Sequence, residues 1–174
     1  MGKLILVIGG ARSGKSRYAL ALAEDTPRKT LIATLKPLDE EMEERVRSHR
    51  RERGPGWRVI EEPIKVAEAV AAAAGKCELV LVDCVTLWLT NLLLAGRSEN
   101  NMKLELERLR KLAAKPPCRL LIVSNEVGLG IVPADRLTRQ FRDLQGAANQ
   151  MLAQSAAEVV MMVSGLPLKL KEPR

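Results

Sequence analysis

Residues 9–16, with the sequence G-G-A-R-S-G-K-S, restrict the possible folds of this chain more than any other segment. They match the P-loop pattern G-x-x-x-x-G-K-S and directly follow an apolar run at residues 4–8. A strand, a glycine-rich turn and a helix opening at Lys15 together direct backbone N–H groups toward a phosphate chain. We expect Lys15 to reach the β- and γ-phosphates and the Ser16 hydroxyl to complete the coordination of Mg²⁺. The segment therefore predicts a binding site for a nucleoside triphosphate.

Apolar, β-branched runs alternate with helical patterns along the sequence, which is typical of a parallel α/β sheet. The predicted strands are residues 4–8, 30–33, 58–60, 79–82, 120–124 and 159–163, with a short edge strand at 168–170. The predicted helices are residues 15–24, 39–53, 65–74, 87–94, 101–114 and 135–156. In the last helix, one buried face is predicted from the spacing of Leu137, Phe141, Leu144, Ala148 and Leu152. Together with the P-loop, this order predicts one domain over residues 1–174. Its fold would be a RecA-like P-loop NTPase, a doubly wound, mostly parallel sheet with helices on both faces.

The composition restricts the possible partners and the cellular compartment. The formal net charge is +7, but aromatic residues make up only 2% of the chain, so the stacking surfaces of single-strand nucleic-acid binders are not expected. Many of the basic residues lie at 45–58, where an anionic small-molecule substrate explains them equally well. No apolar run approaches the length of a membrane span, and because the first predicted strand begins at residue 4, we expect no signal peptide. Because Cys77, Cys84 and Cys118 have no C-x-x-C spacing, we expect buried or half-buried thiols in a cytoplasmic protein.

Polar residues follow three of the predicted strands. In sheets of this class ligands bind at the carboxyl ends of the strands, so these positions are candidates for the site. Residues 34–36 follow the second strand, Asp83 follows residues 79–82, and Asn125 and Glu126 follow the run that ends near Ser124. Asp83 has the position of the acid that holds the magnesium shell, and its structural alternative is a cap for the next helix. Asn125 and Glu126 give a weaker signal, because polar pairs at strand ends often serve only the turn.

The predicted helix at residues 39–53 contains the only histidine of the chain, His49. Arg45 and Arg53 lie four residues before and after it, which places cations beside the ring. In one interpretation His49 ends an apolar stripe and has no chemical role, which is the commoner outcome for an isolated histidine. In the other, the cations disfavour the protonated ring and hold a polyphosphate against a neutral nucleophile. The pattern alone leaves both roles open.

Taken together, these motifs resemble one family, the bifunctional adenosylcobinamide kinase / adenosylcobinamide-phosphate guanylyltransferases of cobalamin biosynthesis. The resemblance covers nearly the whole chain. Beyond the P-loop, Asp83 and the helix with His49, it rests on an ordered series of short matches: Ile32-Ala33-Thr34, Trp57 with Glu61, Thr90-Asn91-Leu92-Leu93, Ser124-Asn125-Glu126-Val127-Gly128, Gly130-Ile131-Val132-Pro133, Arg136, Arg139, Phe141-Arg142-Asp143, Asn149-Gln150 and Val163-Ser164-Gly165. Many folds share a P-loop, whereas this series in this order is specific.

The resemblance implies roles for particular residues. In the family a histidine on this helix accepts GMP from GTP, and His49 is the candidate here. The residues implied to contact the nucleotide are Gly9, Gly10, Ala11, Arg12, Ser13, Gly14, Lys15, Ser16, Thr34, Leu35, Lys36, Arg50, Arg51, Glu52, Arg53, Glu61 and Asp83. Ser16 and Asp83 are the implied ligands of Mg²⁺. Leu35, Lys36 and Pro37 depart from the family pattern, in which smaller or polar residues usually follow Ala-Thr. A homotrimer is also implied.

Two reactions follow from the resemblance. In the first, ATP or GTP phosphorylates adenosylcobinamide. In the second, GMP passes from GTP through guanylyl-His49 to adenosylcobinamide phosphate and gives adenosylcobinamide-GDP. Two alternatives stand beside this interpretation: a P-loop kinase for another small alcohol or nucleoside, in which His49 is structural, and a regulatory NTPase module that acts on nucleic acid through the basic cluster.

Overall fold

A seven-stranded sheet forms the centre of the molecule in the computed structural model, which describes residues 2–36, 40, 44, 47 and 56–172. The strands are β1 (Leu4–Gly9), β2 (Lys29–Ala33), β3 (Trp57–Glu61), β4 (Leu79–Asp83), β5 (Arg119–Asn125), β6 (Glu158–Val163) and β7 (Leu166–Lys171). Their order is β3-β2-β4-β5-β1-β6-β7, and neighbours are parallel except for the antiparallel pair β6 and β7. The predicted mostly parallel sheet is therefore confirmed.

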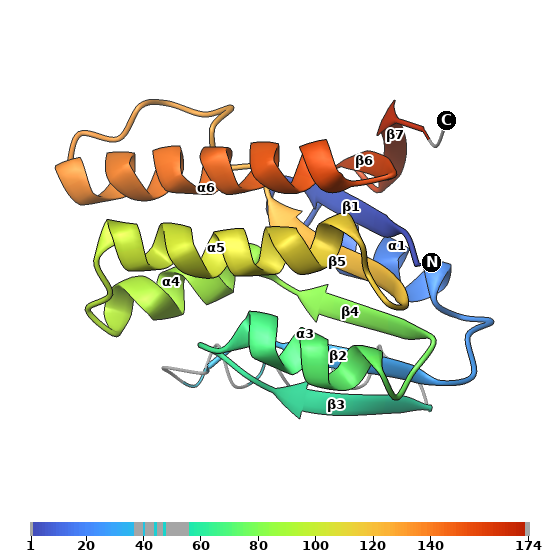
Figure 1. The fold of residues 1–174 in the computed structure, drawn as a ribbon. Helices are drawn as coiled ribbons and strands as arrows, with labels where there is room; N and C mark the ends of the chain where they lie inside the picture. Colours follow the sequence, from blue (N-terminus) through green and yellow to red (C-terminus); the bar gives the residue numbers. More distant parts are fainter. Residues whose placement is uncertain (1, 37–39, 41–43, 45–46, 48–55, 173–174) are drawn as a thin grey trace.

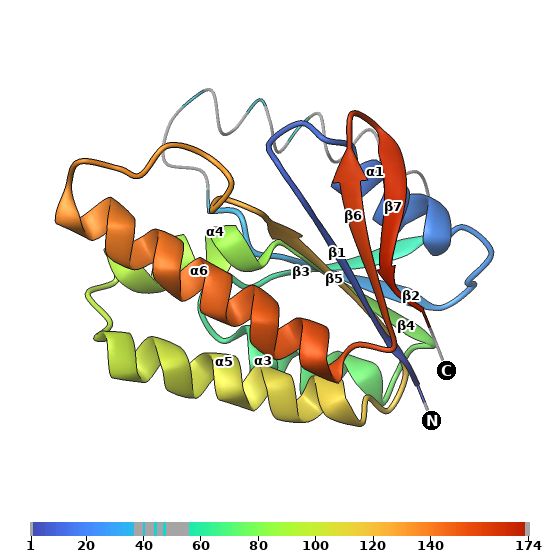
Figure 2. The same ribbon diagram turned by 90° about the horizontal axis from the view of Figure 1, so that it is seen from above.

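Within the described part of the chain, helices lie on both faces of this sheet, as predicted (Figures 1 and 2). The described helices are α1 (Lys15–Leu22), α3 (Val66–Ala74), α4 (Val85–Leu94), α5 (Glu99–Ala114) and α6 (Arg136–Ser155). Helices α3 to α6 cover one face, whereas α1 packs on the other face (Figure 2). Of the helix predicted at 39–53, the described residues Glu40, Glu44 and Arg47 are helical and exposed. The remainder of that prediction, including His49, lies outside the described residues.

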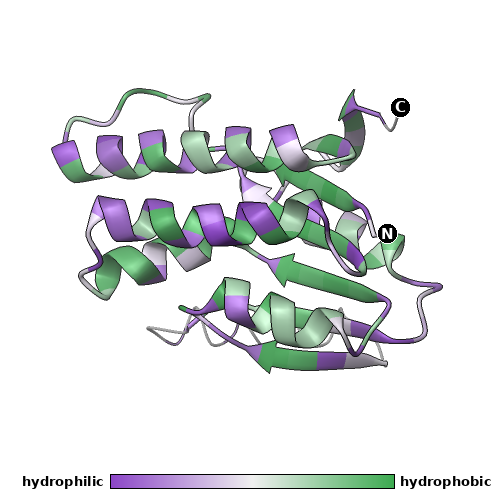
Figure 3. Ribbon diagram, in the orientation of Figure 1, coloured by the Kyte–Doolittle hydropathy of each residue, from purple (hydrophilic) through white to green (hydrophobic). Residues whose placement is uncertain are grey.

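The two faces of the strands explain the long apolar runs in the sequence. Leu4 and Leu6 of β1 belong to the core beneath α3 to α6, whereas Ile5 and Val7 belong to the core beneath α1. Because successive side chains of a strand point to opposite faces, a strand covered on both sides is apolar at every position. Figure 3 shows this as green over most of the central strands β1 and β4, whereas the edge strand β3 and the helices also carry purple segments. In the central strands β1, β4 and β5 the polar residues are therefore confined to the strand ends.

Two predictions about individual segments need correction. The helical spacing predicts Leu137 on the buried face of the last helix, but its exposed fraction is 56%, whereas Leu144, Ala148 and Leu152 are buried. The reason is that the first turns of α6 extend beyond the ends of the strands (Figure 1), and Leu137 is the second residue of this helix. The edge strand β7 is longer than residues 168–170 and includes Pro167, which an edge strand tolerates. Cys84 and Cys118 are buried and Cys77 is half-buried, as expected.

Candidate nucleotide-binding site

The P-loop connects β1 to α1 and depends on two glycines. Gly9 has φ = +149°, and a Cβ built there would lie 2.5 Å from the carbonyl oxygen of Met162. Gly14 is the N-cap of α1 and has φ = +94°. A residue with a side chain would be strained at both positions, because side chains disfavour left-handed backbone and the space at Gly9 is filled. The two glycines therefore fix the shape of the turn between strand and helix.

The first turn of α1 has the properties of an anion site. Its N-cap makes no side-chain hydrogen bond, and no acidic residue lies in the turn. The first N–H groups of a helix have no acceptor within the helix, and the helix dipole makes this end positive. Lys15 lies at the same place: only 8% of it is exposed, and its Nζ donates to the Gly10 carbonyl and to Ser13 Oγ. The backbone and the ammonium group together favour a bound phosphate chain.

Asp83 lies directly opposite the start of α1. Ser16 Oγ donates a hydrogen bond to Asp83 Oδ1 at 3.4 Å, which joins the second residue of α1 to the last residue of β4. The helix that follows β4 has Cys84 as its N-cap and no side-chain cap bond. The structural alternative for Asp83, capping of that helix, is therefore wrong.

The pair of Ser16 and Asp83 fits a magnesium ion. Hydroxyl and carboxylate oxygens are hard donors of the kind that Mg²⁺ prefers, and the ion commonly takes one or two protein ligands, with phosphates and waters completing six. Within residues 2–36 and 56–172, this pair belongs to no cluster of three acidic, histidine or cysteine side chains. The donor set therefore suits an ion held jointly by protein and nucleotide.

Cys84 follows Asp83 but is not a nucleophile. Burial, and next the negative charge of Asp83, raises the pKa of its thiol to about 11. The thiol is therefore protonated at neutral pH, and only the thiolate attacks readily.

The end of β2 is bound firmly to this turn. The hydroxyl of Thr34 accepts a hydrogen bond from the Cys84 N–H and donates one to the Cys84 carbonyl, both at 2.8 Å. The Thr34 carbonyl in turn accepts from Asn91 Nδ2 at 2.7 Å. Thr34 is 0% exposed. Its two hydrogen bonds with Cys84 hold the end of β2 against the backbone beside Asp83. A direct contact of Thr34 with nucleotide stays a prediction.

The end of β5 is anchored by a buried polar cluster that the sequence reasoning missed. Ser124 Oγ donates to Asn149 Oδ1 at 2.7 Å, and Gln145 Nε2 donates to Ser124 Oγ at 2.8 Å. The backbone of Asn125 is bound on both sides: its N–H donates to Thr86 Oγ1 at 2.9 Å, and its carbonyl accepts from Asn149 Nδ2 at 3.0 Å. Ser124 and Gln145 are 0% exposed. The available signal was the pair Gln145 and Asn149, spaced one helical turn apart on the apolar face of α6.

The loop after β5 begins with a turn made by a carboxylate. Glu126 Oε1 accepts a hydrogen bond from the Gly128 N–H at 2.7 Å, while the Glu126 N–H donates to the Gly9 carbonyl at 3.0 Å. Apolar side chains beyond the turn are exposed, with Leu129 79% and Ile131 97% accessible. The loop therefore presents an apolar surface beside the P-loop, and its ordering over a bulky ligand stays a prediction.

The structure brings together only part of the predicted set. The P-loop, Asp83 and Thr34 lie side by side, with Leu35 half-buried and Lys36 exposed just beyond Thr34. Glu61 ends β3 at the same edge of the sheet, but β2, β4 and β5 lie between β3 and the P-loop strand. The predicted contacts outside the described residues are His49, Arg50, Arg51, Glu52 and Arg53.

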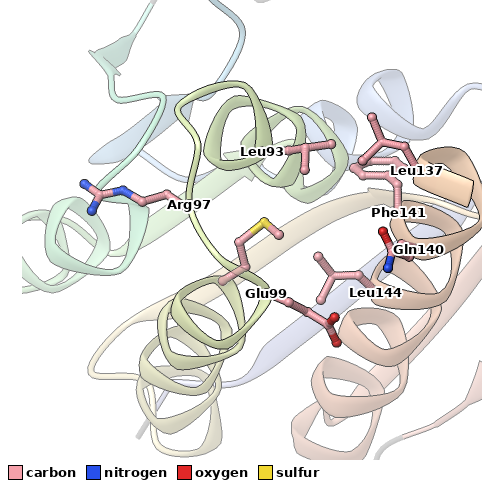
Figure 4. A pocket seen from close by; sticks show the side chains of 8 residues that line it. Leu93, Arg97, Glu99, Leu137, Gln140, Phe141 and Leu144 are labelled. Carbon is pink, nitrogen blue, oxygen red and sulfur yellow. The ribbon is translucent and has the colours of Figure 1, made fainter.

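A separate cavity of about 200 Å³ lies among α4, α5 and α6 (Figure 4). Leu93, Leu137 and Phe141 approach one another on one side of it, and Arg97 and Glu99 come from the segment between α4 and α5 and from the start of α5. None of its lining residues belongs to the P-loop or to the ends of β4 and β5. The cavity is therefore distinct from the nucleotide site.

Among the helices that the structure describes, none has the length and apolar character needed to cross a membrane.

Solved structures support the fold. The crystal structure of the RadB recombinase matches with a TM-score of 0.54 at 14% identity, covering 92% of this chain and 74% of that one. A likeness at this level of identity concerns the fold alone. It agrees with the predicted RecA-like P-loop fold.

Sequence comparison establishes the family. The model for cobinamide kinase / cobinamide phosphate guanyltransferase matches residues 5–170. The bifunctional adenosylcobalamin biosynthesis protein CobU of Escherichia coli (strain K12) is 41% identical over 180 residues, which cover 97% of this chain and 99% of that protein. The corresponding protein CobP of Pseudomonas aeruginosa is 43% identical over 169 residues, with 95% and 96% covered. This chain belongs to the cobinamide kinase / cobinamide phosphate guanyltransferase family.

Proposed function

We propose that the protein first transfers the γ-phosphoryl group of ATP or GTP to the hydroxyl of the aminopropanol arm of adenosylcobinamide. The hydroxyl oxygen bonds to the γ-phosphorus, the bond to the β-phosphate oxygen breaks, and the hydroxyl proton is released. The nucleoside diphosphate and adenosylcobinamide phosphate are the products. The observation that carries this proposal is the Ser16–Asp83 hydrogen bond of 3.4 Å beside Lys15 in the P-loop.

The described residues act by holding the triphosphate and balancing its charge. The N–H groups at the start of α1 bind phosphate oxygens, and Lys15 moves from the Gly10 carbonyl to the β- and γ-phosphates. Ser16 and Asp83 would hold Mg²⁺, which supplies neutralisation of the charge that develops during transfer. Phosphoryl transfer needs positioning and charge stabilisation more than covalent chemistry, and these residues supply both.

The second proposed reaction transfers GMP. A His49 ring nitrogen attacks the α-phosphorus of GTP and expels pyrophosphate, which leaves guanylyl-His49. Adenosylcobinamide phosphate then attacks the same phosphorus, carries off GMP and releases the histidine. Family membership supports this role, and His49 is the only histidine of the chain. Since a P-loop exposes the γ-phosphorus and this step needs the α-phosphorus, we infer that the nucleotide is placed differently in the two reactions.

Two further features belong to the proposal. We expect a homotrimer, because the family resemblance implies one, and light scattering of the purified protein would measure the mass of the assembly. We also expect the protein to work in the cytoplasm, where its nucleotide substrates are found.

The test of the second reaction is a labelling experiment with a built-in control. The protein is mixed with Mg²⁺ and GTP labelled at either the α- or the γ-phosphate, and is then denatured. We expect the α-label, but not the γ-label, to remain on the chain in an acid-labile, alkali-stable form that His49→Ala abolishes. The absence of α-label, together with normal phosphorylation of adenosylcobinamide, would reduce the protein to a kinase with a structural His49.

A further inference from the structure

Asn125 occupies the position in the sheet where ligands of doubly wound folds bind. The helix after β1, α1, packs on one face, whereas the helix after β5, α6, packs on the other. β1 and β5 are adjacent, and the helices that follow them lie on opposite faces of the sheet. In doubly wound folds, the ligand-binding crevice opens at the carboxyl ends of two such strands. Gly9, the first residue of the P-loop, and Asn125 are register partners at that point. Asn125 therefore lies beside the P-loop strand rather than at a distant strand end.

The alternation of the strand places the Asn125 side chain on the same face as Asp83. Ser124 points toward α6, where it binds Asn149. Asn125 follows it and so points to the opposite face, which is the face covered by α1. Val123, two residues earlier, is buried in the core beneath α1 and is the register partner of Asp83. Asp83 and Asn125 thus project from neighbouring strands toward the start of α1.

The backbone of Asn125 is held so that its side chain is not needed for the turn. Its N–H is bound by Thr86 and its carbonyl by Asn149, while the turn after the strand is closed by Glu126 and Gly128. Within the part of the chain that the structure describes, the side-chain amide of Asn125 makes no hydrogen bond. The residue is half-buried, so part of its side chain is accessible at the end of β5. A fixed backbone with a free amide is the arrangement of a preorganised donor.

We propose that Asn125 is a catalytic residue whose Nδ2 donates a hydrogen bond to the terminal phosphoryl group of the bound nucleoside triphosphate. This rests on the proposed function, because it takes the P-loop as the site of phosphoryl transfer. A neutral amide donor suits this place: it binds a phosphoryl oxygen without competing with Asp83 for Mg²⁺. The α-phosphate and β-phosphate are held by the P-loop, so the contact distinguishes a triphosphate from a diphosphate.

The test compares two nucleotides by equilibrium binding in Mg²⁺. Wild-type protein, Asn125→Ala and the matched control Asn100→Ala, on the exposed face of α5, are titrated with a non-hydrolysable GTP analogue and with GDP. Since hydrogen bonds to charged groups are strong, we expect Asn125→Ala to bind the analogue about 10- to 100-fold more weakly. Binding of GDP and the thermal midpoint should stay at their wild-type values, and kcat for phosphorylation should fall with the analogue affinity.

Asn125→Asp provides a second variant of the same shape in case the alanine protein does not fold. Its carboxylate faces the triphosphate, so we expect a larger loss of analogue binding than with alanine. The proposal is overturned if analogue and GDP binding fall together, or if neither changes in a folded variant, because Asn125 would then only end the strand. If wild-type protein discriminates between the nucleotides through Asn125 but does not phosphorylate adenosylcobinamide, the proposed substrate is wrong and the role of Asn125 stands.

Discussion

Asp83 and Ser124 lie at the carboxyl ends of the neighbouring strands β4 and β5, yet these two polar residues serve different purposes. At the end of β4, Asp83 points across to Ser16 of the P-loop. At the end of β5, Ser124 points the other way, into a buried cluster with Gln145 and Asn149. The difference is one step of strand alternation, since Ser124 lies on the α6 face and Asp83 on the α1 face. The side of the sheet to which a strand-end residue points thus decides whether it serves chemistry or structure.

The largest effect on activity is expected from Lys15 of the P-loop. Lys15→Met removes the ammonium group from the P-loop while keeping a long side chain, so phosphorylation of adenosylcobinamide should slow by about 10²- to 10³-fold. Far-ultraviolet circular dichroism should be unchanged, because the hydrogen bonds from Lys15 Nζ to the Gly10 carbonyl and to Ser13 Oγ lie within the loop. A steady-state assay with γ-labelled ATP measures the rate. Wild-type turnover in this variant would contradict a role of the P-loop in the reaction.

A smaller effect is expected from the carboxylate at the end of β4. Asp83→Asn keeps the shape but weakens the hold on Mg²⁺, so the metal concentration for half-maximal kinase activity should rise by about 10- to 100-fold. Raised Mg²⁺ should restore part of the rate, which it would not do for a folding defect. Asp25→Asn, in an exposed turn, is the control. An unchanged Mg²⁺ dependence would mean that Asp83 only orients Ser16.

Substitution in the buried polar cluster at the end of β5 should lower the stability of the protein more than its catalytic rate. Asn149→Ala leaves the buried Ser124 hydroxyl without its acceptor and the Asn125 carbonyl without its donor. An unsatisfied buried polar group costs about 1–3 kcal/mol, so the free energy of unfolding in urea should fall by at least that amount. Gln150→Ala, on the exposed side of the same helix, is the matched control and should change little. Equal stabilities of the two variants would show that the cluster does not hold the strand end.

The smallest effect is expected at the start of the helix that carries this cluster. Asp135 is the N-cap of α6, and its Oδ1 accepts from the Thr138 N–H at 2.8 Å. This backbone hydrogen bond lowers the pKa of the Asp135 carboxyl. A lowered folded-state pKa stabilises the fold above the unfolded value of 3.8, and the contribution is lost as pH falls through the folded-state pKa.

Asp135→Ala should therefore lower the thermal midpoint slightly at pH 7, by less than Asn149→Ala does. The difference from wild type should shrink as the pH falls below 3.8. Thermal melts of both proteins over this pH range measure it. A difference that is constant with pH would assign the effect to helix propensity rather than to the charged cap.

The sequence allowed prediction of the features that depend on local pattern. The P-loop glycines, the apolar strands and Asp83 are each recognised from a few neighbouring residues, and the structure has them at the predicted places. The exposed Leu137 was not predictable in this way, because it depends on how far α6 extends past the sheet. Helical spacing shows which residues share a face, but not where the partner of that face ends.

The polar anchors of the site could not be predicted for a similar reason. Asn149 and Ser124 are 25 residues apart, and their hydrogen bond depends on the position of α6 along β5. The same holds for Thr34 and Cys84, which are 50 residues apart. Such contacts are set by the packing of whole elements, whereas single-sequence patterns report only what lies within a few residues.

The most direct test of the account is a product analysis of His49→Ala with adenosylcobinamide, ATP, GTP and Mg²⁺. The account predicts that this protein accumulates adenosylcobinamide phosphate at about the wild-type rate and forms no adenosylcobinamide-GDP, because Lys15, Ser16 and Asp83 are intact while the guanylyl carrier is lost. Formation of adenosylcobinamide-GDP at the native rate would contradict the account, since the GMP group would then travel by a route that does not use the histidine.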